Sequence, residues 1–213
     1  MKKRIARLGL ALLLAAPLGA CALANAGSGP APRLFTLTTP QSAVADGRTA
    51  VQLQISEFAA PAAIDTTRIV FQENANEIKY YAEARWSDTA PNMIQTLLSQ
   101  TLENSGRFAS VFSHGADLNS DYMLMGDIRQ FAAVAGTDDK GGGTSVHVDL
   151  FMRLVRINDR TVTAARDFSV VVPVTGSGIA SVVAAYDAGL HKVLGDISLW
   201  TIQQTTKSAS PSS

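Results

Sequence analysis

The second half of the chain carries the pattern that most constrains its fold. Three segments, 121–134, 144–157 and 161–174, alternate apolar and polar residues with the period of half-buried strands. In the second segment one face is predicted to be core, with Val146, Val148, Leu150, Met152 and Leu154, and the other side carries His147, Asp149, Phe151, Arg153 and Val155. A long segment of helical period follows, with apolar positions on one face at Ile179, Val182, Val183, Tyr186, Leu190, Val193, Leu194 and Ile197. Ser177 is its predicted N-cap. This order predicts an antiparallel meander followed by an amphipathic helix.

Shorter elements are predicted in the first half. Strand patterns lie at 34–38, 50–58, 68–73, 77–82 and 108–112. Between the last two, Ile94, Leu97 and Leu98 recur at helical spacing, with Ser87 or Asp88 as the predicted N-cap and Gly106 after the end. The whole order predicts an α+β domain, in which a mainly antiparallel sheet has two helices packed on one face. Its other face is left without a predicted cover.

The charge distribution separates the N-terminus from the rest. Four of the 18 basic residues, Lys2, Lys3, Arg4 and Arg7, lie in the first seven positions. Without them, 14 basic residues stand against 18 acidic ones, a net charge of −4. A mildly acidic domain has little electrostatic basis for binding nucleic acid or an anionic membrane surface. No nucleic-acid partner is therefore predicted, and any membrane attachment is expected to be covalent.

The basic tip begins a secretory signal peptide. An apolar stretch from Leu8 to Leu18 follows it, and the small residues Gly19 and Ala20 come next. A transmembrane helix is the alternative, but Pro17 interrupts the run, which ends short of the roughly 20 apolar residues that a span needs. Residues 1–20 are accordingly predicted to be removed.

The only cysteine, Cys21, comes directly after this segment. Leu18-Gly19-Ala20-Cys21 resembles the lipobox of bacterial lipoproteins, where the thiol is lipidated and the chain is cut just before it. The resemblance implies a diacylglycerol on the sulfur and a further acyl chain on the new amino terminus, and several chains together anchor a protein stably. Ala22 stands where an inner-membrane retention signal typically has Asp, so outer-membrane delivery is implied. Cys21 is the predicted lipidation site.

Four parts follow from these patterns. They are a signal peptide at 1–20, the lipidated cysteine and a flexible tether at 21–33, one α+β domain at 34–203 and a disordered tail at 204–213. Small and polar residues with prolines suit the tether, and an almost wholly polar composition suits the tail. At 46% hydrophobic and 17% charged residues, 213 residues are enough for one well-filled core.

No pattern indicates catalysis or metal binding. The three histidines, His114, His147 and His191, fall on a predicted loop, strand and helix, without the spacing of metal ligands. Ser177 lacks the G-x-S-x-G spacing of a hydrolase nucleophile. The sequence therefore predicts no catalytic residue, no metal site and no cofactor.

Two further segments have polar patterns of their own. The carboxylates at 117–121 and at Asp138 and Asp139 lack the Gly and distal Glu of a calcium loop. The segment 136–143 is glycine-rich but runs into a strand, so it predicts a mobile tip and not a phosphate cradle.

The order of features resembles the ABC-type transport auxiliary lipoprotein family, which includes PqiC-like lipoproteins and partners of MCE lipid-transport systems. The resemblance rests on the lipobox, on 33–40 (RLFTLTTP), on 51–88, on 90–102 (APNMIQTLLSQTL), on 121–131 (DYMLMGDIRQF) and on the terminal helix. Phe35 departs from the family, where Tyr is common, and so does the glycine-rich tip.

The resemblance implies a non-catalytic, outer-membrane-anchored subunit of an ABC/MCE-type lipid-transport system that contacts an MCE-type periplasmic protein. A stand-alone structural or envelope-assembly lipoprotein and a lipoprotein hydrolase are the alternatives. The 12 residues between Cys21 and Leu34 reach at most about 40–45 Å, so a partner must span the envelope. Docking is expected through the uncovered sheet face, the edge strands or the tip at 136–143. Monomer and homo-oligomer both remain open.

Overall fold

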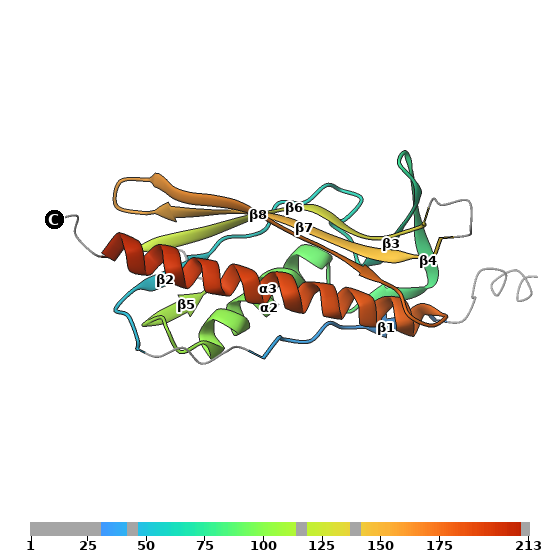
Figure 1. Cartoon of the computed structure of the whole chain (residues 1–213), viewed down its shortest axis with the longest axis horizontal. Helices are drawn as coiled ribbons and strands as arrows, with labels where there is room; N and C mark the ends of the chain where they lie inside the picture. The colour runs from blue at the N-terminus through green and yellow to red at the C-terminus, as the bar shows by residue number, and fades with distance from the viewer. Residues whose placement is uncertain (1–30, 42–46, 114–118, 137–141, 210–213) are drawn as a thin grey trace, which may run out of the picture. The chain divides into compact units, whose positions relative to one another are not determined.

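The structure, a computed structural model, describes residues 31–41, 47–113, 119–136 and 142–209. The predicted signal peptide and Cys21 lie outside these residues. The strands are β1 (Arg33–Phe35), β2 (Gln52–Ile55), β3 (Arg68–Asn74), β4 (Glu77–Trp86), β5 (Ser110–Phe112), β6 (Tyr122–Val134), β7 (Ser145–Arg156) and β8 (Thr161–Pro173). The helices are α2 (Ala90–Asn104) and α3 (Ile179–Ala209), and Figure 1 shows α3 running along the length of the sheet. The predicted α+β class is confirmed.

All eight strands of the described residues join one sheet. The predicted meander is confirmed, because β6, β7 and β8 pair antiparallel along almost their whole lengths. The strands β3 and β4 form a hairpin and are also antiparallel. The long strands of the meander place one edge of β6 against β7 and leave the opposite edge of β6 free for the strands of the first half.

The sheet is mixed, and the expectation of a mainly antiparallel sheet is wrong. The free edge of β6 pairs in parallel with β2 near its start, where Leu53 is opposite Tyr122, and with β3 near its end, where Phe71 is opposite Ala133. The β1–β4 and β2–β5 pairs are parallel too. Parallel neighbours require long crossover connections, and α2 lies in the connection that leads to β5. Apolar alternation predicts a strand but not the direction of its neighbour.

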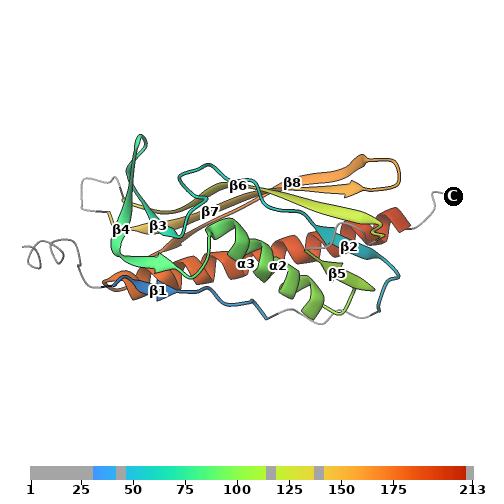
Figure 2. The same ribbon diagram turned by 180° about the vertical axis from the view of Figure 1, so that it is seen from behind.

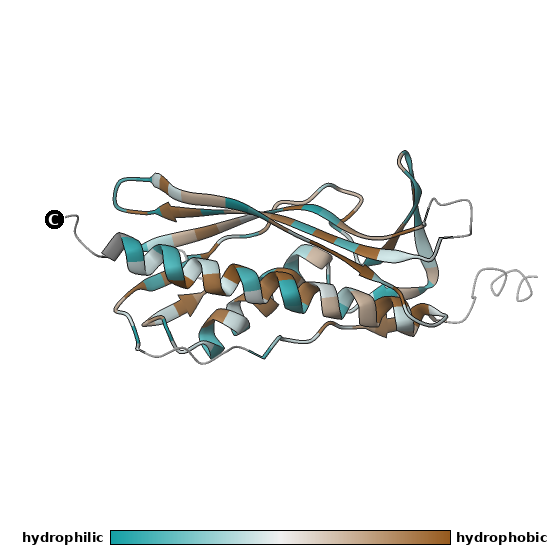
Figure 3. Cartoon of the chain, viewed as in Figure 1, coloured by the Kyte–Doolittle hydropathy of each residue, from teal (hydrophilic) through white to brown (hydrophobic). Residues whose placement is uncertain are grey.

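The inner face of the meander packs against α3. Alternate residues of β7, Val146, Val148, Leu150, Met152 and Leu154, are at most 1% exposed. On α3, Gly189 permits a close approach, since a Cβ there would lie 3.2 Å from a methyl group of Val148. Further along, Trp200 meets the ring of Phe168 edge-on at 5.5 Å between centroids. Figure 3 shows how hydrophobic and hydrophilic residues alternate along α3 and along these strands.

The first helix packs beside α3 and near the end of β2. The Gln95 side-chain amide donates to the carbonyls of Ile55 and Ser56, at 3.3 and 3.0 Å. Figure 2 shows α2 in front of α3 when the chain is seen from behind. The N-cap of α2 is Thr89, so the prediction of Ser87 or Asp88 is wrong. The Asp88 carboxylate instead accepts the Thr89 backbone N–H at 2.7 Å, because the chain is still extended at Thr89.

Both ends of α3 differ from the sequence-based expectation. The helix begins after Gly178, whose φ of +83° suits glycine, so Ser177 lies one residue too early to be its N-cap. At the other end it continues past residue 203 to Ala209. Thr201 and Thr205 are almost fully buried there, and each hydroxyl donates to a carbonyl one turn earlier. The polar end of α3 can therefore stay helical while it is partly buried, because its threonine hydroxyls are hydrogen-bonded within the helix and do not need water as a partner.

Candidate functional site

A polar clamp fixes the segment after β1 onto α3. The backbone N–H and the hydroxyl of Thr38 donate to the two carboxylate oxygens of Asp187, at 2.7 and 2.8 Å. His191 Nε2 lies 2.8 Å from the Thr38 hydroxyl and 2.9 Å from its carbonyl oxygen. The Asp187 carboxylate also lies 3.6 Å from His191 Nε2, the same ring nitrogen that contacts Thr38, so it does not orient the ring through the opposite nitrogen as in a catalytic triad. The clamp gives His191 a structural role.

The other predicted candidates have separate surroundings. His147, on β7, has its Nε2 3.0 Å from the hydroxyl of Ser145, far from α3 in sequence and on a different element from His191. The Ser177 carbonyl accepts a hydrogen bond from the Ser181 hydroxyl at 3.1 Å. Cys21, His114, Asp117, Asp138 and Asp139 lie outside the described residues.

Within 31–41, 47–113, 119–136 and 142–209, no three His, Cys, Asp or Glu side chains gather closely enough to hold a metal ion. None of the helices there combines the length and the apolarity that crossing a membrane requires.

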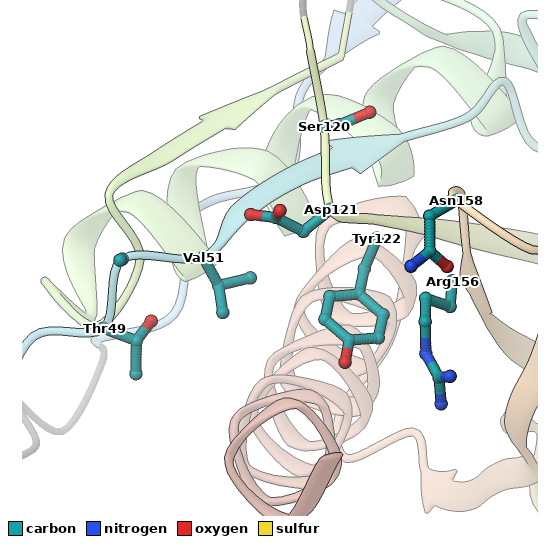
Figure 4. Close-up of a pocket in the computed structure, with 8 residues that line it drawn as sticks. Thr49, Val51, Ser120, Asp121, Tyr122, Arg156 and Asn158 are labelled. Atoms are coloured by element: carbon teal, nitrogen blue, oxygen red, sulfur yellow. The ribbon is translucent and has the colours of Figure 1, made fainter. Parts of the chain in front are cut away.

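A cavity of about 430 Å³ opens where β2 and β6 begin and β7 ends (Figure 4). Tyr122 and Arg156 are opposite each other in the β6–β7 register and extend side by side in Figure 4. The Asp121 carboxylate accepts the backbone N–H of Gln52 at 2.8 Å, and Arg156 pairs with Asp159 at 3.1 Å. Both charged groups thus hold strand ends together, and the cavity carries no nucleophile with a base beside it.

The outer face of the meander, which points away from α3, carries an ordered row of charges. Arg153 pairs with Asp127 at 2.6 Å, and Arg129 pairs with Asp167. The ring of Phe151 lies between the two guanidinium groups, which are 4.3 and 4.4 Å from its centroid. These five residues form what we call the outer-face ladder. Its charged side chains are 36–55% exposed, so they contribute little to stability and remain available for contact.

Asp149 lies beside the outer-face ladder, and its carboxylate differs from those of Asp127 and Asp167. Its Oδ1 is shielded from solvent and has no hydrogen-bond partner among the described residues. Burial raises the pKa of the Asp149 carboxyl, nearby Asp167 raises it further, and Arg129 lowers it in part. The alternation of the strand predicts that Asp149 lies on its outward side, but a period-2 pattern carries no signal for a carboxylate that lacks a partner.

The family match covers most of the chain. Residues 35–198 match the ABC-type transport auxiliary lipoprotein component family. The chain belongs to this family. An uncharacterized protein of Bradyrhizobium diazoefficiens is 30% identical over 179 residues, which are 83% of this chain and 47% of the relative. The chain therefore spans about half the length of that curated relative.

Solved structures support the same fold. Protein XCC0632 from Xanthomonas campestris, a DUF330 protein, superposes with a TM-score of 0.75 at 26% identity. That match covers 83% of this chain and 98% of the other. The hypothetical protein CT253 from Chlamydia trachomatis shares the fold at 9% identity and a TM-score of 0.53, over 75% of this chain and 99% of its own.

Proposed function

We propose that this chain is a non-catalytic, outer-membrane-anchored lipoprotein subunit of an ABC/MCE-type lipid-transport system, and that it docks a periplasm-spanning component. The family match at 35–198 carries the proposal. The lipobox-like Leu18–Cys21 lies shortly before the matched residues, where a lipoprotein anchor is expected. Membership of an auxiliary component family implies work alongside an ABC transport system. To this family membership the proposal adds three features: anchoring in the outer membrane, a lipid as the transported molecule, and an MCE-type partner.

The anchor sets where the domain can act. With lipid on Cys21, the 12 residues before Leu34 limit the tether to about 40–45 Å. A domain of this size has a radius of gyration of about 16 Å. Together they are too short to reach machinery in an opposite membrane. A partner that crosses the periplasm must therefore come to the domain, which makes docking the central part of the proposed function.

The outer face of the meander is the surface best suited to that docking. It lies opposite α3, its ladder charges are half-exposed, and the Arg129–Phe151–Arg153 stack is already ordered. An ordered surface loses little side-chain entropy when a partner binds. Of the candidate catalytic groups that are described, His147 and His191 contact Ser145 and Thr38, and the Ser177 carbonyl accepts a hydrogen bond from Ser181. No hydrogen bond of the described residues joins one candidate to another, which favours binding over hydrolysis.

Site-specific photo-crosslinking in cells tests the proposal. A photoreactive residue at His147 or Arg153 should capture the MCE-type protein, identified by mass spectrometry. Lys192 on α3 is the matched control, since its side chain is 60% exposed and lies on the helix rather than the outer face. Absence of the MCE-type protein from every outer-face position, in cells where transport is running, would contradict docking and favour the structural or envelope-assembly alternative.

A further inference from the structure

A second cavity, of about 310 Å³, lies on the outer face between the meander and the β3–β4 hairpin. Its lining combines an apolar wall with a few polar groups; the residues are Pro61, Ala63, Ile64, Val70, Gln72, Ile78, Arg129, Gln130, Ala132 and Asp149. The turn that closes one side is fixed by a hydrogen bond from Ile64 N–H to the Pro61 carbonyl at 2.8 Å. The cavity is thus formed by elements that the fold already holds in place.

Among the described charged groups around this cavity, the carboxylate of Asp149 has no ion-pair partner. Arg153 is paired with Asp127, and Arg129 is paired with Asp167. No ion pair of the described residues includes Asp149, and its Oδ1 accepts no hydrogen bond from them. The neighbouring amide of Gln130 donates to Gln72 at 3.3 Å rather than to Asp149. The cavity therefore presents a shielded carboxylate oxygen without a donor among the described residues, beside an arginine, Arg129, that is already paired with Asp167.

The rest of the cavity suits an aliphatic chain. Ile64, Val70 and Ala132 are at most 7% exposed and form its wall, while Ile78 at its rim is 49% exposed. Lysine buries its methylene stem along apolar surface while its ammonium group makes polar contacts. Arginine would bind best to both oxygens of a carboxylate, and here one shielded oxygen is left without a partner.

We propose that this cavity receives a lysine side chain of the protein that docks on the outer face, with its ammonium group on Asp149. The identity of that protein rests on the proposed function, whereas the ammonium preference of the cavity does not. A phosphatidylethanolamine head group also carries an ammonium group, but only two carbons separate it from a phosphate. That phosphate would have to take Arg129, the one cation among the described lining residues, from its ion pair with Asp167, whereas a lysine stem needs only the apolar wall.

Binding of small probes to the full chain in detergent micelles tests the inference. The probe is N-acetyl-lysine N-methylamide, and the readout is the methyl NMR signals of Ile64, Val70 and Ile78. The lysine probe should shift these signals saturably, and the uncharged norleucine analogue should not. Asp149→Asn should weaken binding about 10–100-fold, the range expected for a charge-assisted hydrogen bond. Asp196→Asn, at an exposed carboxylate on α3, is the matched control and should bind like the wild type.

A second variant keeps the test independent of Asp149 itself. Ile78→Arg places a cation at the half-exposed rim and should block the lysine probe while Asp149 remains. Equal responses to the lysine and norleucine probes, or unchanged binding by Asp149→Asn, would overturn the inference. Tighter binding of O-phosphorylethanolamine than of the lysine probe would overturn it in favour of a lipid head group.

The proposed function and this inference fail separately. If the lysine probe does not bind while crosslinking from His147 still captures the MCE-type protein, the lysine site is wrong and docking stands. If the probe binds but no outer-face position captures that protein, the proposed partner is wrong and the ammonium site stands.

Discussion

The hydroxyl of Tyr186 donates a 2.8 Å hydrogen bond to the backbone carbonyl of Val70, and this bond joins the N-terminal part of α3 to β3. Tyr186 is fully buried and lies against Trp86 and Phe131, at 5.2 and 4.8 Å between ring centroids. Burial raises the pKa of its phenol well above the ordinary value, so the hydroxyl stays a donor throughout the physiological range. One residue thus connects the helix, the hairpin and the meander.

Tyr186→Phe should lower the free energy of unfolding by about 0.5–1.5 kcal/mol, because it removes a buried hydrogen bond between α3 and β3. Denaturant unfolding of the chain measures the loss. Tyr122→Phe is the matched control: Tyr122 is also buried, but its side chain lines the cavity in Figure 4. We expect a smaller loss there, and equal losses for the two variants would show that the Tyr186 bond is not the cause.

Leu190→Asp should destabilise the chain by about 3–5 kcal/mol, since Leu190 is fully buried between α3 and the sheet and the new carboxylate would have no partner. Thermal or denaturant unfolding checks this. Leu199→Asp on the same helix is the control, because Leu199 is 52% exposed and should change stability by no more than about 0.5 kcal/mol. A similar stability for both variants would mean that the Leu190 face is not buried in solution.

The sequence predicted those parts of the fold that depend on local period. The alternation of β7 identified the buried side of the strand, and the spacing on α3 identified Tyr186 and Leu190 as core residues. The parallel pairing of Leu53 with Tyr122 was missed, since the two strands lie far apart in the chain and a local pattern does not show which strands pair across a crossover connection. The cap at Thr89 was missed by one residue because neighbouring polar residues compete for the same role.

The candidate site was less accessible to prediction. His147 and Arg153 were placed on the outer side from the pattern alone, and both lie on the outer face. The missing partner of Asp149 depends on which arginine pairs with which aspartate across three strands. Such pairing follows from strand register and side-chain conformation, neither of which a single sequence displays.

Gly126→Ala should destabilise the chain by about 1–3 kcal/mol, because a Cβ at this position of β6 would lie 2.7 Å from the ring of Phe58. Phe58 is 4% exposed and packs into the core beside the strand. Replacing the ring by a smaller side chain should relieve the clash. In a double-mutant cycle, Gly126→Ala with Phe58→Leu should therefore lose less stability than the two single changes together. Strict additivity would show that the two residues do not share space.

Cys21→Ser should leave the chain unlipidated, because a hydroxyl does not replace the sulfur nucleophile in diacylglyceryl transfer. Metabolic labelling with a palmitate analogue, followed by gel shift of the precursor, measures this. Serine at another position of the tether region, Ala24→Ser, is the control and should label like the wild type. Label at the wild-type level in Cys21→Ser would contradict the lipobox assignment and with it the covalent anchor.

Asp149→Asn should raise the melting temperature at pH 7, by about 1–3 °C. Burial and Asp167 raise the pKa of the Asp149 carboxyl in the folded chain. A group with a raised pKa contributes stability below its unfolded value, about 3.9, and that contribution is lost as pH rises through the folded value. At pH 7 the wild type therefore holds an unfavourable ionised carboxylate, which the amide removes. The gain should shrink as pH falls, because the Asp149 carboxyl of the folded chain, whose pKa is raised, becomes protonated and loses its charge. Melting curves of both proteins between pH 4 and 8 measure it, with Asp196→Asn as the exposed control. A lower melting temperature of Asp149→Asn at pH 7 would mean that the Asp149 carboxylate already has a stabilising partner and is not free to bind a lysine.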